Sequence, residues 1–368
     1  MNCEEIQRNM SLTALQSENN KQSTIVIVRY ILDRIGLPVL CAFGILGNGL
    51  NVVILTRKQL QQSMDRMEKS VHLGLVALAV SDMLFCVVAL PTSFTPATMV
   101  YTERDAFFFL YYFMYKEPFH NIFLLSSTWL TVAMATGRYM GICYPLHARG
   151  FVNLRATRIS ILGIFVFSVA FNLPQFWRYR LLELPCSPKC KCFMPVIAAL
   201  YKNVHFKISY KILWAILGVF VPLFMLAFCN ICLIKALRES RRMRQMYRAN
   251  KTKHEPGHRL TQTLIAIIAM FILLVSPSEI LKFVESWVVR SASLSAFNAF
   301  MISQLLANFL VVINFTVNFI LYCVLNAHFR KTVRNSLCCV PKKQDLYKSS
   351  NHTTLVMNIS DCAEAIEL

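Results

Sequence analysis

Three ionisable side chains stand out because long apolar stretches surround them. Asp82 is the only charged residue within Val71–Tyr101, and a carboxylate buried there must be neutralised by a proton, a cation or hydrogen bonds. His120 lies within the stretch Pro118–Gly137, and Arg138 follows it directly. Ionisable residues inside such segments are costly and are commonly functional. The pattern therefore predicts functional sites at these positions, with cation binding as the chemistry open to Asp82.

Seven apolar stretches must position these side chains. They are Ile35–Thr56, Val71–Tyr101, Pro118–Gly137, Ile159–Trp177, Ile212–Ile234, Leu260–Ser278 and Ser291–Ala327. A helix needs about 20 apolar residues to cross a bilayer, and every stretch is close to that length or longer. Only 15% of the residues are charged, against about 25% in an ordinary soluble chain. We therefore expect an all-α integral membrane protein with a bundle of seven transmembrane helices.

The distribution of basic residues predicts the orientation of the bundle. Of the 38 Lys and Arg residues, 22 fall on the side shared with the C-terminus and 15 on the opposite side. Basic loops stay cytoplasmic, so we expect an extracellular N-terminus at the plasma membrane, with Asn9 glycosylated. The net charge of +19 then follows from the membrane topology, because the basic residues face anionic lipid. We therefore expect no nucleic-acid partner.

The same reading divides the chain into four parts. Residues 1–30 form an extracellular tail, residues 31–326 the membrane domain, residues 327–340 a short amphipathic helix on the membrane surface, and residues 341–368 a cytoplasmic tail. Cys338 and Cys339 form an adjacent pair after the last span, where palmitoylation is expected.

Landmark motifs follow one another along the spans in a fixed order. They are Gly47-Asn48-Gly49, Leu78 to Asp82, Gly137-Arg138-Tyr139, Pro222, Phe271 with Pro277, and Asn318 to Tyr322. Together they resemble the rhodopsin-like (class A) family of G-protein-coupled receptors, over roughly residues 35–339. Trp129 to Ala133 and Thr92 to Pro96 look most like the FMRFamide-like neuropeptide receptors of invertebrates.

The resemblance implies roles for particular residues. Asp82, Ser127, Asn314 and Asn318 would bind an allosteric sodium ion, although a protonated or water-bonded Asp82 remains the alternative, and no cofactor is expected. Arg138, Tyr139, Phe271, Pro277 and Tyr322 would serve activation and coupling to a heterotrimeric G protein, with arrestin and a receptor kinase as further partners.

Several positions depart from the family pattern. Gly137 replaces the acid that restrains Arg138, and Val275 replaces the aromatic switch of the sixth helix. Phe113 replaces the cysteine that would tie the third helix to the second outer loop. Four cysteines are still expected outside the membrane: Cys3, Cys186, Cys190 and Cys192. They could form a disulfide bridge within the loop or one between the loop and the N-terminal tail.

The outer ends of the spans carry a mixed polar set that suits a short peptide better than a lipid. The candidate ligand-binding residues are Thr92, Glu117, His120, Glu279, Lys282, Phe283, Gln304 and Asn308. The loop from Arg178 to Lys211 has seven basic residues against Glu183 alone. This charge favours a peptide that enters amine-first and leaves acidic groups near the loop lysines, which are Lys189, Lys191 and Lys202.

A transporter and an enzyme are the two other classes of protein that could bury ionisable residues in this way. A seven-helix transporter or ion pump would also bury Asp82, but the chain has no series of carboxylates for a proton relay. An enzyme would need clustered metal-type ligands, whereas Asp82 and His120 fall in different spans. We therefore predict a peptide receptor and no enzymatic activity, with a receptor for a non-peptide ligand as the remaining alternative.

Overall fold

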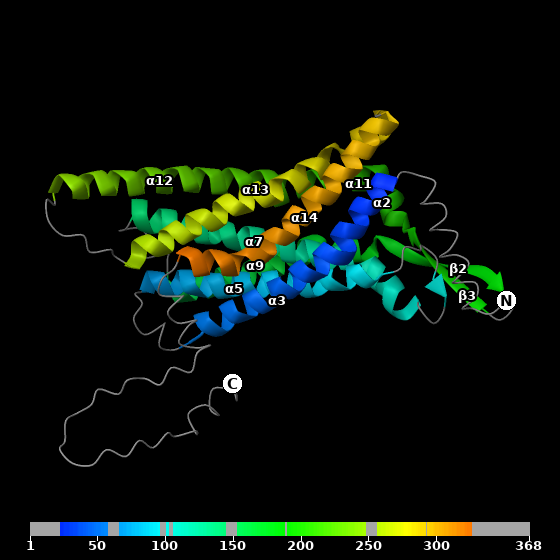
Figure 1. Ribbon diagram of the computed structural model, residues 1–368, viewed down its shortest axis with the longest axis horizontal. Coiled ribbons are helices and arrows are strands. Elements are labelled where there is room, and N and C mark those ends of the chain that lie inside the picture. The colour runs from blue at the N-terminus through cyan, green and yellow to red at the C-terminus, as the bar shows by residue number, and fades with distance from the viewer. Residues whose placement is uncertain are drawn as a thin grey trace, which may run out of the picture.

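All seven apolar stretches contain long helices in the structure, a computed structural model. It describes residues 23–57, 66–95, 101–102, 106–144, 153–187, 190–247, 256–291 and 293–325. The helices run roughly along one direction and pack as a bundle (Figure 1). The predicted fold class is thereby observed in the described part of the chain.

The helical segments extend beyond most of the predicted stretches. The first span comprises α2 (Ser23–Arg29), η1 (Tyr30–Gly36) and α3 (Leu37–Leu55), and the second comprises α5 (Arg66–Ala89) and η2 (Leu90–Phe94). The third comprises η3 (Ala106–Leu110) and α7 (Tyr111–Cys143), and the fourth α9 (Leu154–Asn172) and η4 (Leu173–Trp177). The remaining segments are α10 (Ala199–Lys202), α11 (Val204–Trp214), η5 (Ala215–Phe220), α12 (Val221–Tyr247), α13 (Pro256–Ser291) and α14 (Leu294–Leu325).

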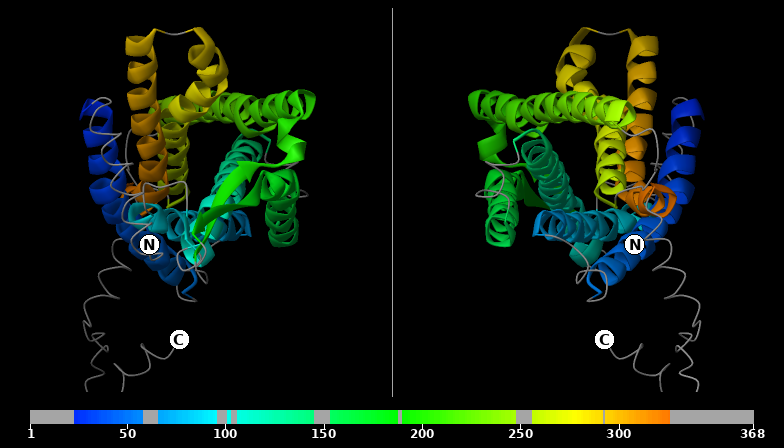
Figure 2. Two further views of the ribbon diagram at one scale, coloured as in Figure 1. Left: turned by 90° about the vertical axis from the view of Figure 1, so that its right-hand side faces the viewer. Right: turned by 90° about the vertical axis from the view of Figure 1, so that its left-hand side faces the viewer.

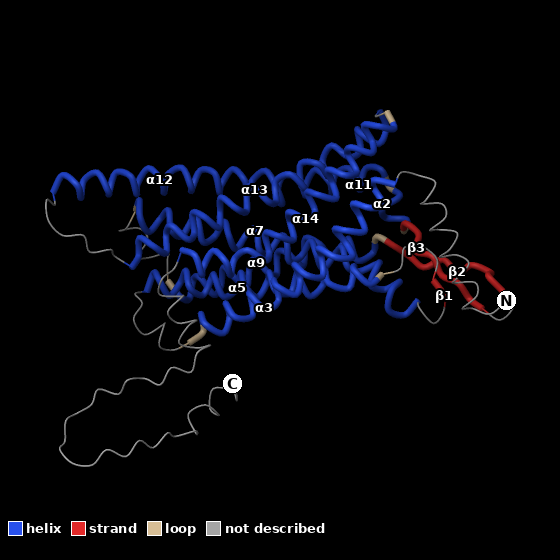
Figure 3. The backbone as a smooth tube through the Cα atoms, in the orientation of Figure 1, coloured by secondary structure: helices blue, strands red, loops and turns tan. Residues whose placement is uncertain are grey.

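A small antiparallel sheet lies at one end of the bundle and was not predicted. It consists of β1 (Tyr101–Thr102), β2 (Tyr179–Ser187) and β3 (Cys190–Ile197) in the order β1-β3-β2. Tyr101 was expected to close the second span, but that helix ends at Phe94 and Tyr101 pairs with Phe193 of β3. The strands lie at the end opposite to the projecting end of α12 (Figure 3).

The distribution of apolar side chains fits a bilayer. Large apolar residues are exposed on the outside of the bundle, among them Leu46, Phe224 and Leu273, whereas Asn48 and Asp82 are fully buried. Among the described residues, five helical segments are long and apolar enough to cross a membrane: Thr24–Leu55, Lys69–Phe94, Leu154–Trp177, Val204–Ala236 and Ser295–Ile320. The two remaining long helices, α7 and α13, contact each other.

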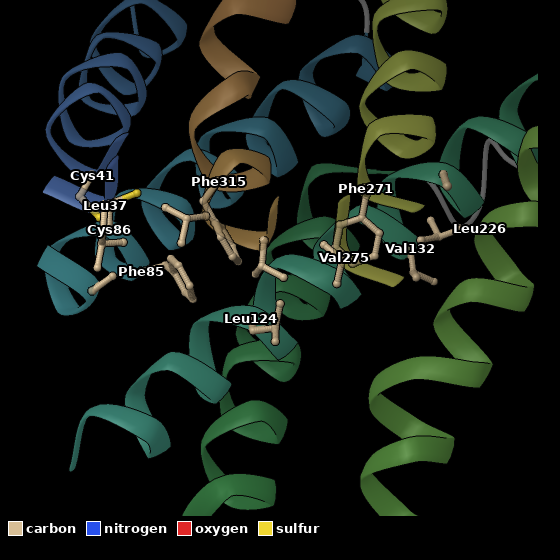
Figure 4. Close-up of a cluster of buried hydrophobic side chains, with 14 of the residues drawn as sticks. Leu37, Cys41, Phe85, Cys86, Leu124, Val132, Leu226, Phe271, Val275 and Phe315 are labelled. Carbon is tan, nitrogen blue, oxygen red and sulfur yellow. The ribbon is translucent and has the colours of Figure 1, made fainter. Parts of the chain in front are cut away.

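Helix α7 lies at the centre of the packing, since it contacts α5, α9, α12 and α13. At the other side of the bundle, α13 and α14 run side by side next to the first span (Figure 2). The main apolar core joins these groups through Phe85 on α5, Leu124 on α7, Phe271 on α13 and Phe315 on α14 (Figure 4). The core therefore holds together the helices that carry the predicted sites.

Small residues let the first two spans approach closely. A Cβ atom built on Gly44 would lie 2.6 Å from Cys86 Sγ and 2.8 Å from a methyl group of Thr316. Only glycine fits between α5 and α14 at this point, as is common where membrane helices pack tightly.

Several predicted features lie outside the described residues. They are the tail with Cys3 and Asn9, the surface helix 327–340 with Cys338 and Cys339, and the cytoplasmic tail 341–368. The backbone is described at Cys186, Cys190, Phe283 and Tyr322, but their side chains are not.

Candidate functional site

Asp82 accepts hydrogen bonds from two neighbouring helices. The Ser127 hydroxyl on α7 donates to Asp82 Oδ1 at 2.9 Å, and Asn318 Nδ2 on α14 donates to Oδ2 at 2.5 Å. Asn314 is buried one turn before Asn318. The structure thus brings three of the four proposed sodium ligands into direct contact and places the fourth on the same helix.

This oxygen-rich cluster fits a hard cation. Asp82 is 0% exposed, and neither ion pair found among the described residues includes it. Besides its two hydrogen bonds, a proton or a cation would offset its charge. Carboxylate, hydroxyl and amide oxygens are the ligands that hard cations prefer. Nearby, Asn48 Nδ2 on α3 donates to the Phe315 carbonyl at 2.7 Å, which ties the first span to α14.

A second polar cluster joins the last residue of α11 to the part of α13 that follows Pro277. Glu279 is buried, and Lys282 Nζ lies 2.8 Å from its Oε1 while Trp214 Nε1 donates to its Oε2 at 3.1 Å. Both carboxylate oxygens are therefore occupied. An incoming ligand amine would have to displace Lys282, so Glu279 acts first as the counter-ion of Lys282.

Glu117 and His120 lie one turn apart on α7 and contribute a further pair of polar groups. Glu117 is in the electrostatic range of His120, Lys116, Lys282 and Arg178. The Lys116 ammonium lies 5.9 Å from the centre of the Tyr112 ring, and Arg178 lies 5.4 Å from the centre of the Tyr179 ring. The cations around Glu117 are thus stacked on aromatic rings or paired with Glu279.

The other predicted ligand-binding residues have mixed surroundings. Thr92 shares a 2.6 Å hydrogen bond with Tyr112, so its hydroxyl joins η2 to α7. Asn308 accepts a hydrogen bond of 2.6 Å from Ser278, which joins α14 to α13. Gln304 is half-buried on α14. Thr92 and Asn308 therefore already serve helix packing.

An aromatic stack connects His120 with the core below it. The His120 ring stacks on Phe85 at 5.0 Å between centroids, and Phe85 stacks on Phe315 at 3.8 Å. The stack crosses α7, α5 and α14, and Phe315 follows Asn314 of the cation cluster. Sequence reasoning missed Phe85 and Phe315 because both look like ordinary core residues in an apolar span. It also missed Trp214, which lies 65 residues from Glu279.

The β1-β3-β2 sheet is fixed to α7 by apolar contacts. Tyr101, Leu110 and Met114 form a buried cluster against which Tyr179 and Phe193 pack. The Phe113 ring, at the position where the family has a cysteine, lies 5.6 Å from the Tyr179 ring. Cys192 is buried and disulfide-bonded. Packing on Phe113 thus replaces the covalent link between α7 and the outer loop.

Of the predicted coupling residues, Arg138 and Tyr139 lie at the opposite end of α7, whereas Phe271 and Pro277 lie further along the bundle on α13. Arg138 is 2% exposed, and the neighbouring Tyr139 ring lies 5.6 Å from Phe228 on α12. Phe271 is buried in the main core together with Val275. Pro277 lies inside α13, where it removes a backbone hydrogen bond and favours a kink. A Cβ atom built on Gly137 would have no neighbour within 4 Å.

Comparison with known families decides the assignment. The model of the family described as "7 transmembrane receptor (rhodopsin family)" matches residues 47–344, which is most of the chain. The chain belongs to this family. The receptor is therefore a multi-pass membrane protein and not an enzyme, as the sequence predicted, and the resemblance to class A receptors is confirmed.

Individual relatives share about a quarter of their residues with this receptor. Sex peptide receptor-related protein 2 of Caenorhabditis elegans is 24% identical, with 82% of this chain and 70% of that protein covered. The FMRFamide receptor of Drosophila melanogaster is 24% identical, with 80% of this chain and 52% of that protein covered. Galanin receptor type 1 of Homo sapiens is 23% identical, with coverages of 82% and 80%. The predicted similarity to neuropeptide receptors is thereby confirmed.

Proposed function

We propose that the receptor binds a short extracellular peptide at the outer end of its bundle and activates a heterotrimeric G protein at the other end. The observation that supports this most directly is the set of charged groups around Glu117, Glu279 and Lys282, next to the β2–β3 sheet. A lipid would gain little from so many ionisable groups, whereas a peptide offers charged and amide groups to each. The named relatives include receptors for peptides.

The cytoplasmic end supports the coupling half of the proposal. Helix α12 extends to Tyr247 and carries exposed Arg238 and Arg242 beyond the apolar part of the span. A basic helix end attracts an acidic partner surface and anionic lipid. Arrestin and a receptor kinase would use the same side of the plasma membrane, with the N-terminus outside. Palmitoylation of Cys338 and Cys339 would hold the following segment at the lipid surface.

Sodium would act as an allosteric ligand of this receptor. Asp82, Ser127, Asn314 and Asn318 would hold the ion, and occupancy would tie α5, α7 and α14 together in the resting state. The outer cysteines would close one bridge that includes Cys192, within the loop or to Cys3.

The test is a peptide library applied to cells that express the receptor and report calcium and cyclic AMP. We expect at least one peptide pool to raise a signal that cells without the receptor lack. The matched variant is Lys282→Gln, which removes the cation that is paired with Glu279. This variant should raise the peptide concentration needed for a half-maximal response at least about tenfold. A response to lipids or amines and to none of the peptides would contradict a peptide ligand.

A further inference from the structure

A cavity of about 130 Å³ lies between α5, α7 and α9, at the end of the bundle that the charge distribution places in the cytoplasm. Along α9 its lining runs from Ala156 to Ile164, which is roughly 12 Å at a rise of 1.5 Å per residue. Ala133 on α7 lines the cavity and is itself exposed. The cavity therefore opens on the outside of the bundle as a groove that a lipid can enter from the bilayer.

Gly137 is the residue that keeps part of this groove open. It lines the cavity, and a Cβ atom built on it would have no neighbour within 4 Å. The acidic side chain that Gly137 replaces would occupy some of this space. The open groove thus follows from a position at which this receptor departs from the pattern of its family.

The dimensions of the groove favour a flexible chain over a rigid ring system. A protein cavity of about 150 Å³ holds a molecule as small as benzene. A volume of about 130 Å³ spread along this part of α9 is therefore too narrow for the fused rings of a sterol, but it accepts methylene groups of an acyl chain. The apolar side chains in the lining, such as Leu130, Met134 and Ile161, lose packing contacts while the groove is empty.

Basic residues surround the cytoplasmic end of the groove. Arg155 and Arg158 are exposed and flank two lining residues of α9, and Lys69 directly precedes the lining residue Ser70 on α5. Helix α9 contains no Asp or Glu. Clustered cations at this depth attract the anionic headgroups of the inner leaflet. The groove thus combines an apolar space for a chain with a positive charge at the level of the headgroups.

We propose that an anionic phospholipid of the inner leaflet binds in this groove, with one acyl chain beside Gly137 and its phosphate near Arg155 and Arg158. The bound chain packs against α7 directly before Arg138, in the space of the side chain that restrains this arginine elsewhere in the family. Lipid composition thereby becomes a regulator of the receptor. The proposal rests on the proposed membrane orientation and not on the nature of the extracellular ligand.

The experiment uses the full-length receptor in phosphatidylcholine nanodiscs with a trace of phosphatidylserine that carries a photoactivatable diazirine in one acyl chain. After irradiation, mass spectrometry of the peptides locates and quantifies the label. The cavity variant is Gly137→Ile. Its matched control is Gly163→Ile, because a Cβ atom on Gly163 would also have no neighbour within 4 Å but Gly163 does not line the cavity. If Gly137→Ile yields no folded receptor, Ala133→Leu, which narrows the same cavity, is read in its place.

A second pair of variants tests the headgroup. Arg155→Gln combined with Arg158→Gln removes two positive charges at the groove. Arg180→Gln combined with Lys207→Gln removes two exposed positive charges at the opposite end of the bundle and is the control.

In wild type we expect label on the peptides of α7 and α9 that line the cavity. Gly137→Ile should lower this label about tenfold, because the chain loses its space. The loss of Arg155 and Arg158 should lower it several-fold, whereas both controls should leave it unchanged. Unlabelled phosphatidylserine should displace the label at a concentration at least about fivefold below that of phosphatidylcholine.

Three results would overturn the proposal. One is the absence of label from the α7 and α9 peptides, and another is an equal label in Gly137→Ile and Gly163→Ile. The third is displacement by cholesterol or phosphatidylcholine that equals displacement by phosphatidylserine, since the occupant would then be a sterol or a neutral lipid. None of these results involves a peptide agonist, so the peptide-receptor proposal stands or fails separately.

Discussion

At the scale of single residues, the cost of burying charge determines which groups can respond to a ligand. Asp82 is fully buried with two neutral hydrogen-bond donors, which lower the cost of its charge but do not remove it. Glu279, by contrast, is neutralised by Lys282. A proton or a cation from solution is therefore expected at Asp82 and not at Glu279.

Replacing Asp82 by asparagine should abolish the sodium dependence of agonist binding. Sodium stabilises the resting state that competes with the agonist-bound state, so raising sodium from zero to about 150 mM should weaken agonist affinity of wild type several-fold, by linkage. Binding of one active peptide is measured in sodium and in an equal concentration of choline. Ser127→Ala should lose a smaller part of this sodium dependence. Wild-type affinity that is indifferent to sodium would contradict the site.

At the scale of elements, α7 is held to the fifth span by a bond to irregular backbone. The segment η5 (Ala215–Phe220) is a π-helix, which displaces the regular pattern of backbone hydrogen bonds. Trp129 Nε1 on α7 donates to the Leu217 carbonyl inside this segment at 3.2 Å. The same indole packs edge-on against Phe167 of α9. One side chain thus joins three helices at the level of the π-helix.

Trp129→Phe should destabilise the receptor by about 1 kcal/mol, because the apolar contact is largely kept and one buried hydrogen bond is lost. The measurement is the temperature at which half of the detergent-solubilised receptor stays monodisperse. Trp177→Phe is the control, since Trp177 is 60% exposed and should leave that temperature unchanged. Equal thermal stability of wild type and Trp129→Phe would show that the bond to Leu217 contributes nothing.

At the scale of the whole molecule, the two ends of the bundle differ in kind. One end carries the β2–β3 sheet, and at the other α12 projects beyond the remaining helices (Figure 1). His120, a predicted ligand-binding residue, lies 18 residues before Arg138 on α7. The His120–Phe85–Phe315 stack crosses α7, α5 and α14 and enters the main apolar core, in which Val275 is also buried.

The charge distribution predicts that the end with the sheet is extracellular. Asn9 should then carry a glycan, and treatment with a glycosidase should lower the apparent mass of wild type but leave that of Asn9→Gln unchanged. Asn351 lies on the predicted cytoplasmic side and serves as the control position. A mass shift that persists in Asn9→Gln and disappears in Asn351→Gln would reverse the orientation.

The sequence by itself determined the seven helices, the family and the location of the buried polar positions. These follow from local properties: about 20 apolar residues in succession, and lone ionisable residues whose burial is too costly to be accidental. Asp82 and Arg138 could be recognised on that basis alone. The limits of the helices could not, because helices such as α12 continue past the apolar stretch into polar surroundings.

Only the tertiary structure decided which polar groups are already satisfied. Glu117 and Glu279 look alike in the sequence, yet Glu279 is occupied by Lys282 and Trp214. The outer sheet and the cavity beside Gly137 were equally hidden. Hydrogen bonds and ring contacts join residues up to 267 positions apart, as between Asn48 and Phe315, and the packing of helices sets which side chains meet.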